Sequence, residues 1–234
     1  MFASRAWQDV QLGWDALEDA DDQVDRIERA LALEPASRVL DVPCGTGRIA
    51  ARLAARGHQV VGVDVEERFL QEGRERDDGV RYELGDMREL GSRGEFDAVV
   101  CFWGSFGYFD DDGNLEQAKA AARSLKPGGR YLIDTVPAET LFADFRAKNW
   151  FDLDGSSVLL ETFYQLGTGR VETAWTFVAS DGSRETHRSS VRVYTVHEVT
   201  ELLRQAGFSA FRALDDELQD FAIGSSRLWL VATR

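Results

Sequence analysis

A short apolar run that leads into a glycine-rich turn constrains the fold of this chain more than any other stretch. Residues 39–42 read Val-Leu-Asp-Val, which is typical of a central parallel strand covered on both faces. In the glycine turn that follows, residues 43–47, Gly45 and Gly47 permit positive φ angles and a close approach of the backbone to a ligand. Apolar residues then recur at helical spacing over 49–54. This strand, turn and helix suit a nucleotide-like ligand at the carboxyl end of the strand.

The glycine turn by itself leaves the identity of the ligand open. Residues 45–50 fit the G-x-G-x-x-A pattern of dinucleotide-binding folds, which is weak evidence when it stands alone. Asp41, however, precedes the glycines, where a carboxylate is unfavourable beside a pyrophosphate and favourable beside a cationic amine or sulfonium. This position argues against a nicotinamide or flavin cofactor.

Two further strands lead into carboxylates. The apolar run 59–64 ends in Asp64, and its interval from Gly47 is close to the roughly 20 residues after which a strand-end acid binds a ribose. Asp64 could instead be an acid at the start of the following helix, but its combination with the glycine turn favours the ribose. Asp86 follows the strand 80–84, where its side chain and a neighbouring backbone N–H could read the edge of an adenine.

A fourth strand, 95–101, leads into a loop that is unusually aromatic. Five of the eight residues in this aromatic loop, 102–109, are Phe, Trp or Tyr, and two others are glycines. Such a density of aromatic side chains is too high for an ordinary solvent-exposed loop. The aromatic loop is therefore a candidate part of the ligand site.

Composition limits the classes of protein that remain. With 234 residues, 44% hydrophobic and 29% charged, the chain has the make-up of one compact soluble domain. Its formal charge of −14 repels phosphate backbones, so a nucleic-acid partner is not expected. No apolar run is long enough for a membrane span or a signal peptide, which predicts a cytoplasmic protein. Cys44 and Cys101 are too few for a disulfide framework or a zinc site.

These stretches, in this order, resemble the class I S-adenosylmethionine-dependent methyltransferases. The similar segments are 39–50, 61–64, 85–87, 96–101 and 125–130. The likeness is strong to bacterial small-molecule methyltransferases with a D-x-P-C-G-T-G-R turn and an S-F-G-Y-F loop. The resemblance implies a Rossmann-like, doubly wound α/β fold with a seven-stranded sheet whose last strand is antiparallel. It also implies S-adenosylmethionine as the cofactor, S-adenosylhomocysteine as the product, and no metal.

The resemblance also assigns roles to residues. It implies that the two glycines of the glycine turn border the amino-acid part of the cofactor, Asp64 the ribose, and Asp86 with Met87 the adenine. The residues expected at the cofactor are Asp41, Cys44, Gly45, Thr46, Gly47, Asp64, Val65, Asp86, Met87, Phe102, Trp103 and Gly104. The chain departs from the usual family pattern at Pro43, where a glycine is common, so the turn must bind from Cys44 onwards.

The rest of the chain is expected to add two parts to this core. The core is assigned to 37–135 and 195–234, where 195–198 read as a capping box that starts a helix. The insert, 136–194, should hold a helix over 138–147 and three antiparallel strands. These strands are expected at 158–166, 170–179 and 184–194. Such a meander could cover the cofactor cleft and contact the acceptor, or form a structural or dimerising sheet.

Residues 1–36 are expected to form a helical cap on the core. Trp7 and Trp14 would lie on one face of a helix, and an amphipathic helix that follows should end near 34–35. The two tryptophans either seat their helix on the core or form a lid over the ligand. With Tyr108 of the aromatic loop, they are the candidates for binding the substrate.

The expected chemistry places few demands on the chain. Methyl transfer from a sulfonium mainly requires that acceptor, methyl and sulfur be held in line and that water be excluded. A general base is needed only if the acceptor must lose a proton, and the candidates are His187, Tyr164 and Tyr194, although such residues on strands are usually just packed. The sequence thus predicts methyl transfer to a nitrogen or oxygen of a small molecule by a monomer or homodimer. The alternatives are a nicotinamide-dependent oxidoreductase and a non-catalytic cofactor-binding module with a protein partner.

Overall fold

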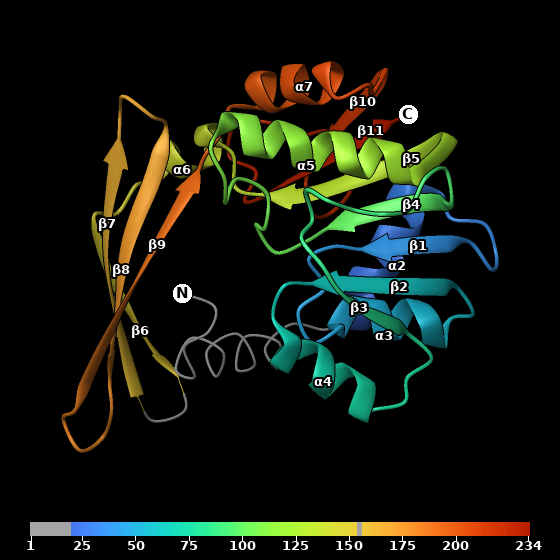
Figure 1. Ribbon diagram of the computed structural model, residues 1–234. Helices are drawn as coiled ribbons and strands as arrows, with labels where there is room; N and C mark the ends of the chain where they lie inside the picture. Colours follow the sequence, from blue (N-terminus) through green and yellow to red (C-terminus); the bar gives the residue numbers. More distant parts are fainter. Residues whose placement is uncertain (1–19, 154–155) are drawn as a thin grey trace.

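The computed structural model describes residues 20–153 and 156–234 (Figure 1). They form a seven-stranded mixed sheet with helices on both faces and a separate sheet of four antiparallel strands. This is the Rossmann-like α/β fold expected from the sequence, and its antiparallel last strand is confirmed. Trp7 and Trp14 lie outside the described residues, so the helical cap and its part in substrate binding stay predictions.

The seven-stranded sheet has the order β10-β11-β5-β4-β1-β2-β3. Its strands are β1 (Arg38–Asp41), β2 (Gln59–Asp64), β3 (Arg81–Leu84), β4 (Phe96–Cys101), β5 (Leu125–Thr135), β10 (Ala210–Leu214) and β11 (Leu228–Thr233). Neighbours from β5 to β3 pair in parallel, whereas β11 runs antiparallel to both β5 and β10. The strand order reverses between β1 and β4, which is where such sheets bind ligands, beyond the carboxyl ends of the strands.

Helices cover both faces of this sheet because its central strands are apolar on both sides. The helices are α2 (Ala20–Leu31), α3 (Arg48–Ala55), α4 (Glu67–Glu75), α5 (Asp111–Ser124), α6 (Ala138–Ala143) and α7 (Val196–Gln205). Val39 and Val100 pack with α2 and α3 in one cluster, and Leu40 and Val99 pack with α5 and α7 in the other. Alternate residues of β1 and β4 therefore face opposite layers, which accounts for the apolar runs in the sequence.

The second sheet lies within the insert and has one strand more than predicted. Its strands, in order, are β6 (Lys148–Leu153), β7 (Ser156–Gln165), β8 (Arg170–Val178) and β9 (Arg184–Arg192). The three predicted strands are confirmed as β7, β8 and β9, but the helix expected over 138–147 ends at Ala143 and β6 was missed. Because β6 pairs with β7 along its whole length, its conformation depends on a partner strand. The Asp-Gly pair at 154–155 was the sequence signal for this hairpin.

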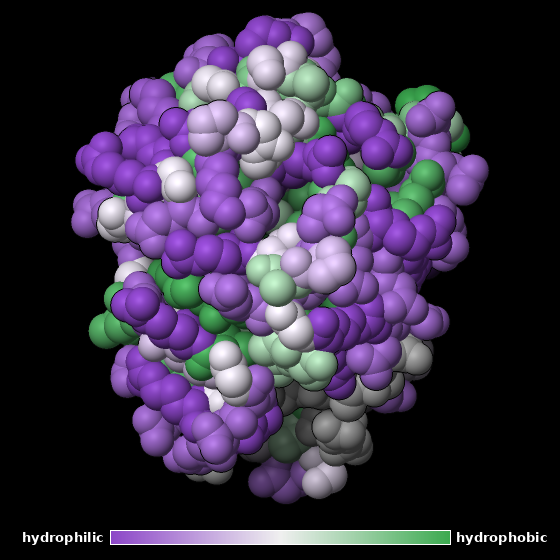
Figure 2. Space-filling model, turned by 90° about the vertical axis from the view of Figure 1, so that its right-hand side faces the viewer, coloured by the Kyte–Doolittle hydropathy of each residue, from purple (hydrophilic) through white to green (hydrophobic). Residues whose placement is uncertain are grey.

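The two ends of the seven-stranded sheet differ in their surroundings. The carboxyl ends of its parallel strands point toward the second sheet, and their amino ends point the opposite way (Figure 1). The face at the amino ends is mainly hydrophilic, with scattered apolar residues (Figure 2). Within the described ranges, no helix combines the length and the apolar character needed to cross a bilayer. The carboxyl ends of the strands, where sheets of this type bind ligands, therefore face the second sheet.

Candidate functional site

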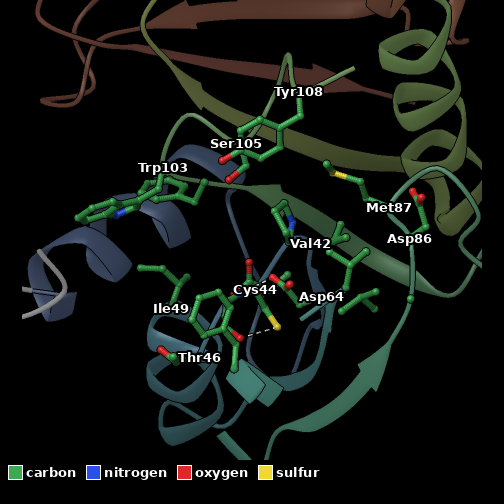
Figure 3. A pocket seen from close by; sticks show the side chains of 18 of the residues that line it. Val42, Cys44, Thr46, Ile49, Asp64, Asp86, Met87, Trp103, Ser105 and Tyr108 are labelled. Atoms are coloured by element: carbon green, nitrogen blue, oxygen red, sulfur yellow. Dashed lines mark hydrogen bonds between the residues drawn. The ribbon is translucent and has the colours of Figure 1, made fainter. Parts of the chain in front are cut away.

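A pocket of about 360 Å³ lies at the carboxyl ends of β1, β2 and β4 (Figure 3). Its volume falls in the range of small-molecule sites. The glycine turn forms one wall, and the aromatic loop forms the wall opposite. The lining residues are Asp41, Val42, Pro43, Cys44, Gly45, Thr46, Arg48, Ile49, Val63, Asp64, Val65, Phe69, Gly85, Asp86, Met87, Phe102, Trp103, Ser105, Tyr108 and Phe109.

Most of the residues predicted at the cofactor line this pocket. They are Asp41, Cys44, Gly45, Thr46, Asp64, Val65, Asp86, Met87, Phe102 and Trp103. Gly47 and Gly104 are not part of the lining, whereas the substrate candidate Tyr108 is. The lining residues that the sequence did not assign individually to cofactor or substrate are Val42, Pro43, Arg48, Ile49, Val63, Phe69, Gly85, Ser105 and Phe109. Most of these are sequence neighbours of predicted residues, but Phe69 lies on α4 and had no signal of its own.

Asp64, at the end of β2, fastens the glycine turn to the sheet. Its Oδ2 accepts a hydrogen bond from the Gly45 N–H at 2.8 Å, and its Oδ1 accepts one from the Glu66 N–H at 2.9 Å. The carboxyl is buried, and this burial raises its pKa. Each carboxylate oxygen has a second lone pair. The arrangement therefore holds the turn and leaves acceptor capacity for a ligand hydroxyl.

Asp41, at the end of β1, is a second buried carboxyl that lines the pocket. Burial and then the charge of Asp64 raise the pKa of Asp41 to about 8, against the opposing effects of the Ala50 N–H and the Arg48 guanidinium. Burial and the nearby Asp64 thus disfavour the ionised form of Asp41. A cationic group in the pocket would favour this ionised form.

Gly47 is required by the packing behind the glycine turn. It has φ +85°, and a Cβ at this position would lie 2.6 Å from Tyr82 Cε1. The Tyr82 hydroxyl donates to Asp78 Oδ2 at 2.9 Å and accepts from Arg76 Nη2 at 3.1 Å, and Arg76 also donates to the Thr46 carbonyl. Gly47 therefore makes room for a tyrosine of β3 that helps to hold the turn.

Trp103, the second residue of the aromatic loop, has a strained backbone and is held by β5. Trp103 has φ +61°, which is uncommon for a non-glycine residue. Its N–H donates to Asp134 Oδ2 at 2.8 Å, and the Gly104 N–H donates to the Asp134 carbonyl at 3.0 Å. Asp134 is buried, and Arg227 pairs with both of its carboxylate oxygens at 2.6 Å. The ion pair thus fixes the start of the aromatic loop.

Asp86 and Met87 line the pocket beyond the end of β3 (Figure 3). The Arg88 guanidinium donates to Asp86 Oδ2 at 2.6 Å, and the Arg88 N–H donates to Oδ1 at 2.8 Å. These bonds lower the pKa of Asp86. The guanidinium also lies 4.1 Å from the ring centroid of Phe109. The Asp86 carboxylate is therefore ionised and held next to the end of the aromatic loop.

Two hydroxyls of the aromatic loop face the pocket from the side opposite the glycine turn (Figure 3). They belong to Ser105 and Tyr108, which interact with one another. Burial raises the pKa of Tyr108 to about 12. Tyr108 is therefore protonated at neutral pH and can donate a hydrogen bond in an otherwise largely aromatic wall.

The three candidate bases lie outside the lining of the pocket. The Tyr194 hydroxyl donates to Asp111 Oδ1 at 2.7 Å and joins the start of α5 to the end of the insert. His187 Nε2 lies 2.6 Å from a carboxylate oxygen of Glu185, its neighbour on β9. The Tyr164 ring packs against Phe142, with ring centroids 4.7 Å apart. None of the three therefore lines the pocket that contains Asp41, Asp64 and Tyr108.

The pocket fits an adenosine that carries a positive charge. Gly45 has φ +55°, and a Cβ there would point into open space, so the turn leaves room beside its backbone. Two buried carboxyls stand at one side, and aromatic rings, whose faces attract cations, stand at the other. Within residues 20–153 and 156–234, no three His, Cys, Asp or Glu side chains gather as a metal site.

Comparison with known sequences points to one family. A family model described as a methyltransferase domain matches residues 39–129. The putative methyltransferase YqeM of Bacillus subtilis (strain 168) is 31% identical, over 79% of this chain and 78% of its own. A dTDP-3-amino-3,4,6-trideoxy-alpha-D-glucopyranose N,N-dimethyltransferase of Streptomyces venezuelae is 30% identical, over 75% of this chain and 74% of its own.

Solved structures share the fold over almost the whole chain. CalS10 of Micromonospora echinaspora, an amino pentose methyltransferase solved with bound S-adenosylmethionine, has a TM-score of 0.72 and 25% identity and covers 99% of this chain and 97% of its own. A methyltransferase from Clostridium acetobutylicum ATCC 824 has a TM-score of 0.80 and 21% identity, with 93% of each chain covered. The nicotinamide-dependent alternative is thereby set aside. The chain belongs to the class I S-adenosylmethionine-dependent methyltransferases.

Proposed function

We propose that this enzyme methylates an amino nitrogen of a small molecule of the amino-sugar class. The observation that supports the proposal is the extent of the similarity to two methyltransferases whose names specify an amino sugar. The dimethyltransferase of Streptomyces venezuelae is similar over 75% of this chain, and CalS10, whose match includes the insert, over 99%. A ubiquinone biosynthesis O-methyltransferase of Dechloromonas aromatica is similar over only 58%. An oxygen acceptor is the alternative.

In this proposal, three carboxyls bind different parts of S-adenosylmethionine. Asp64 uses its remaining lone pairs for the ribose hydroxyls, because it already accepts from the Gly45 N–H of the glycine turn and from the Glu66 N–H before α4. Asp86, ionised and fixed by Arg88, accepts from the adenine amino group beside the backbone N–H of Met87. Asp41 lies where the ammonium group of the cofactor's amino-acid part would reduce the repulsion from Asp64.

The aromatic loop would serve orientation and the exclusion of water. When bound, the cofactor supplies a methyl carbon that its sulfonium has already activated. Phe102, Trp103 and Tyr108 would present ring faces that tolerate the positive charge. The hydroxyls of Ser105 and Tyr108 are the polar groups of this wall that can orient the acceptor. Alignment of this kind can lower a barrier by about 7 to 11 kcal/mol.

The proposal assigns no general base to the chain. An amine that binds in its neutral form can attack without first losing a proton, and the product ammonium can release its proton to solvent. Tyr108 is a poor base because its pKa of about 12 keeps it protonated. His187, Tyr164 and Tyr194 do not line the pocket. A strict requirement for any of these three side chains would contradict this part of the proposal.

We further propose that the insert, 136–194, covers the acceptor side of the pocket. The second sheet stands beyond the carboxyl ends of the core strands (Figure 1) and hydrogen-bonds to residues 107–109 of the aromatic loop. The segment 1–36 would act as a helical cap. Dimerisation through the insert is the alternative, and sedimentation equilibrium with and without an acceptor would distinguish the two.

The experiment that tests the proposal has two steps. Isothermal titration with S-adenosylmethionine and S-adenosylhomocysteine should show binding, and NADH should not bind. A methyl-transfer assay should then show turnover with a nucleotide-linked amino sugar and none with the matched hydroxy sugar. Turnover with the hydroxy sugar alone would overturn the nitrogen assignment. Absence of cofactor binding at millimolar concentration would overturn the proposal as a whole.

A further inference from the structure

The guanidinium of Arg170 joins the second sheet to the aromatic loop. Arg170 is the first residue of β8. Its Nη1 donates to the Phe109 carbonyl at 2.6 Å, and its Nη2 donates to the Tyr108 carbonyl at 3.2 Å. On its other side, Nε donates to Ser190 Oγ and Nη2 to the Ser190 carbonyl, both at 2.8 Å. Hydrogen bonds from a charged donor are stronger than those between neutral groups.

A second contact between the sheet and the loop lies next to the first. The Arg192 N–H of β9 donates to the Gly107 carbonyl at 2.7 Å. Gly107 has φ +109°, and a Cβ at this position would clash with the Arg192 carbonyl oxygen. The glycine therefore allows the loop to lie directly against β9. Together, the backbone of Arg192 and the side chain of Arg170 hold the carbonyls of three consecutive residues, 107–109.

Two of these three residues contribute side chains to the pocket. Tyr108 and Phe109 both belong to its lining. The Phe109 ring lies against the guanidinium of Arg88, which holds Asp86 at the end where the adenine is proposed to bind. Tyr108 pairs with Ser105 opposite the glycine turn. The Phe109 carbonyl also accepts a hydrogen bond from Asn114 Nδ2 of α5 at 3.0 Å. Arg170 and Asn114 together fix the backbone from which both rings project.

We infer that Arg170 is a positioning residue for the cofactor pocket, which makes the insert a working part of the cofactor site rather than only a cover. This inference rests on the proposed function, because it concerns the same pocket. Arg170 touches no reacting atom and acts through Tyr108 and Phe109. Its planar, forked guanidinium suits two neighbouring carbonyls, whereas the single ammonium of a lysine cannot match both.

The alternative role of Arg170 is to hold β8 against β9 through Ser190. Two variants separate this role from positioning. Ser190→Ala removes one of the bonds between the strands and leaves both bonds to the aromatic loop. Arg188→Met removes an exposed arginine from the same sheet. If Arg170 acts on the pocket, both control variants should bind S-adenosylhomocysteine as the unchanged enzyme does.

The test measures S-adenosylhomocysteine affinity by calorimetry for Arg170→Met, Arg170→Lys and the two controls. We expect Arg170→Met to bind on the order of tenfold more weakly, which is the effect of one net interaction of about 1.4 kcal/mol, and Arg170→Lys to lie between it and the unchanged enzyme. In Arg170→Ala, millimolar guanidinium should restore part of the affinity, and sodium chloride at equal concentration should not.

Three results would overturn the inference. The first is an affinity of Arg170→Met equal to that of the unchanged enzyme, and the second is an equal loss in the Ser190→Ala and Arg188→Met controls. The third is a crystal structure of Arg170→Met in which Tyr108 and Phe109 have not moved, a readout that does not depend on the cofactor. Failure of the unchanged enzyme to bind S-adenosylhomocysteine would instead contradict the proposed function, so the two failures are distinguishable.

Discussion

The two walls of the pocket are held in place from different parts of the chain. The glycine turn is fixed by Asp64 at the end of β2, by Arg76 at the end of α4 and by Tyr82 of β3. The aromatic loop is fixed by Asn114 of α5, by Asp134 of β5 and by Arg170 of the insert. Variants near the glycine turn should therefore disturb cofactor binding and folding together. Variants at the remote partners of the aromatic loop should weaken binding with a smaller cost to the fold.

The largest effect is expected for Asp64→Ala, at the residue of β2 that holds the glycine turn. It removes the acceptor for the N–H groups of Gly45 and Glu66 and for the proposed ribose. Hydrogen bonds to charged groups contribute about 1.5 to 3 kcal/mol each, so S-adenosylhomocysteine affinity should fall by about a hundredfold or more in calorimetry. Glu67→Ala removes a neighbouring exposed acid and should bind normally. Unchanged affinity in Asp64→Ala would remove Asp64 from the ribose.

The second prediction compares the stability losses of two glycine-to-alanine substitutions, and so separates the cost of overpacking behind the glycine turn from the cost of backbone strain. Gly47 and Gly57 both have positive φ, but only at Gly47 would a Cβ meet a side chain, that of Tyr82. Gly57→Ala should cost about 1 kcal/mol from its backbone alone. Gly47→Ala should cost on the order of 2 to 3 kcal/mol because overpacking adds to the strain. Urea unfolding measures both, and equal losses would show that Tyr82 does not restrict this turn.

A smaller effect is expected for Asp134→Asn, at a remote partner of the aromatic loop. The change weakens the hold on the Trp103 N–H and leaves Arg227 without its carboxylate. Because the Arg227 side chain is 34% exposed, we expect a stability loss of about 1 to 2 kcal/mol, below the range for fully buried pairs. S-adenosylhomocysteine affinity should fall severalfold. An affinity loss as large as that of Asp64→Ala would contradict the difference between the walls.

The position of each partner in the chain also explains which parts of the site could be predicted from the sequence. The strand, the glycine turn and Asp64 follow one another at fixed intervals, and such local patterns are visible in one sequence. Composition marked the aromatic loop, but nothing in the sequence linked it to Asp134 or Arg170. Contacts between segments so far apart leave no periodic signal. The role of Gly47 was hidden for the same reason, because Tyr82 lies in another strand.

Residue type alone was a poor guide to position. His187 and Tyr194 were candidates because their side chains can accept protons, yet their partners are Glu185 and Asp111. Strand alternation decides which face such a side chain occupies, and the pairing of β9 with β8 sets the face of His187. The seven-stranded sheet was easier to predict because apolar runs and short turns define its strands individually.

The last prediction concerns Asp41, which lines the pocket at the end of β1 and is expected to change the pH dependence of binding. Burial and the charge of Asp64 raise its pKa to about 8 in the free enzyme, and a cationic amine beside it would lower this pKa. Binding should then release a proton below pH 8. S-adenosylhomocysteine affinity should therefore rise with pH toward 8 by at most about tenfold per unit, as long as the ligand amine keeps its own proton.

Asp41→Asn should remove this rise, and the stability of the free protein supplies an independent check. A carboxyl whose pKa is raised by folding loses stability as pH increases from its unfolded value of about 4 through its folded value of about 8. Asp41→Asn should therefore melt at a higher temperature than the unchanged enzyme at pH 8, and gain less at pH 5. Asp97→Asn, at a carboxylate paired with Lys126, should show neither change. A pH dependence of affinity that survives in Asp41→Asn would assign the released proton to a group other than Asp41.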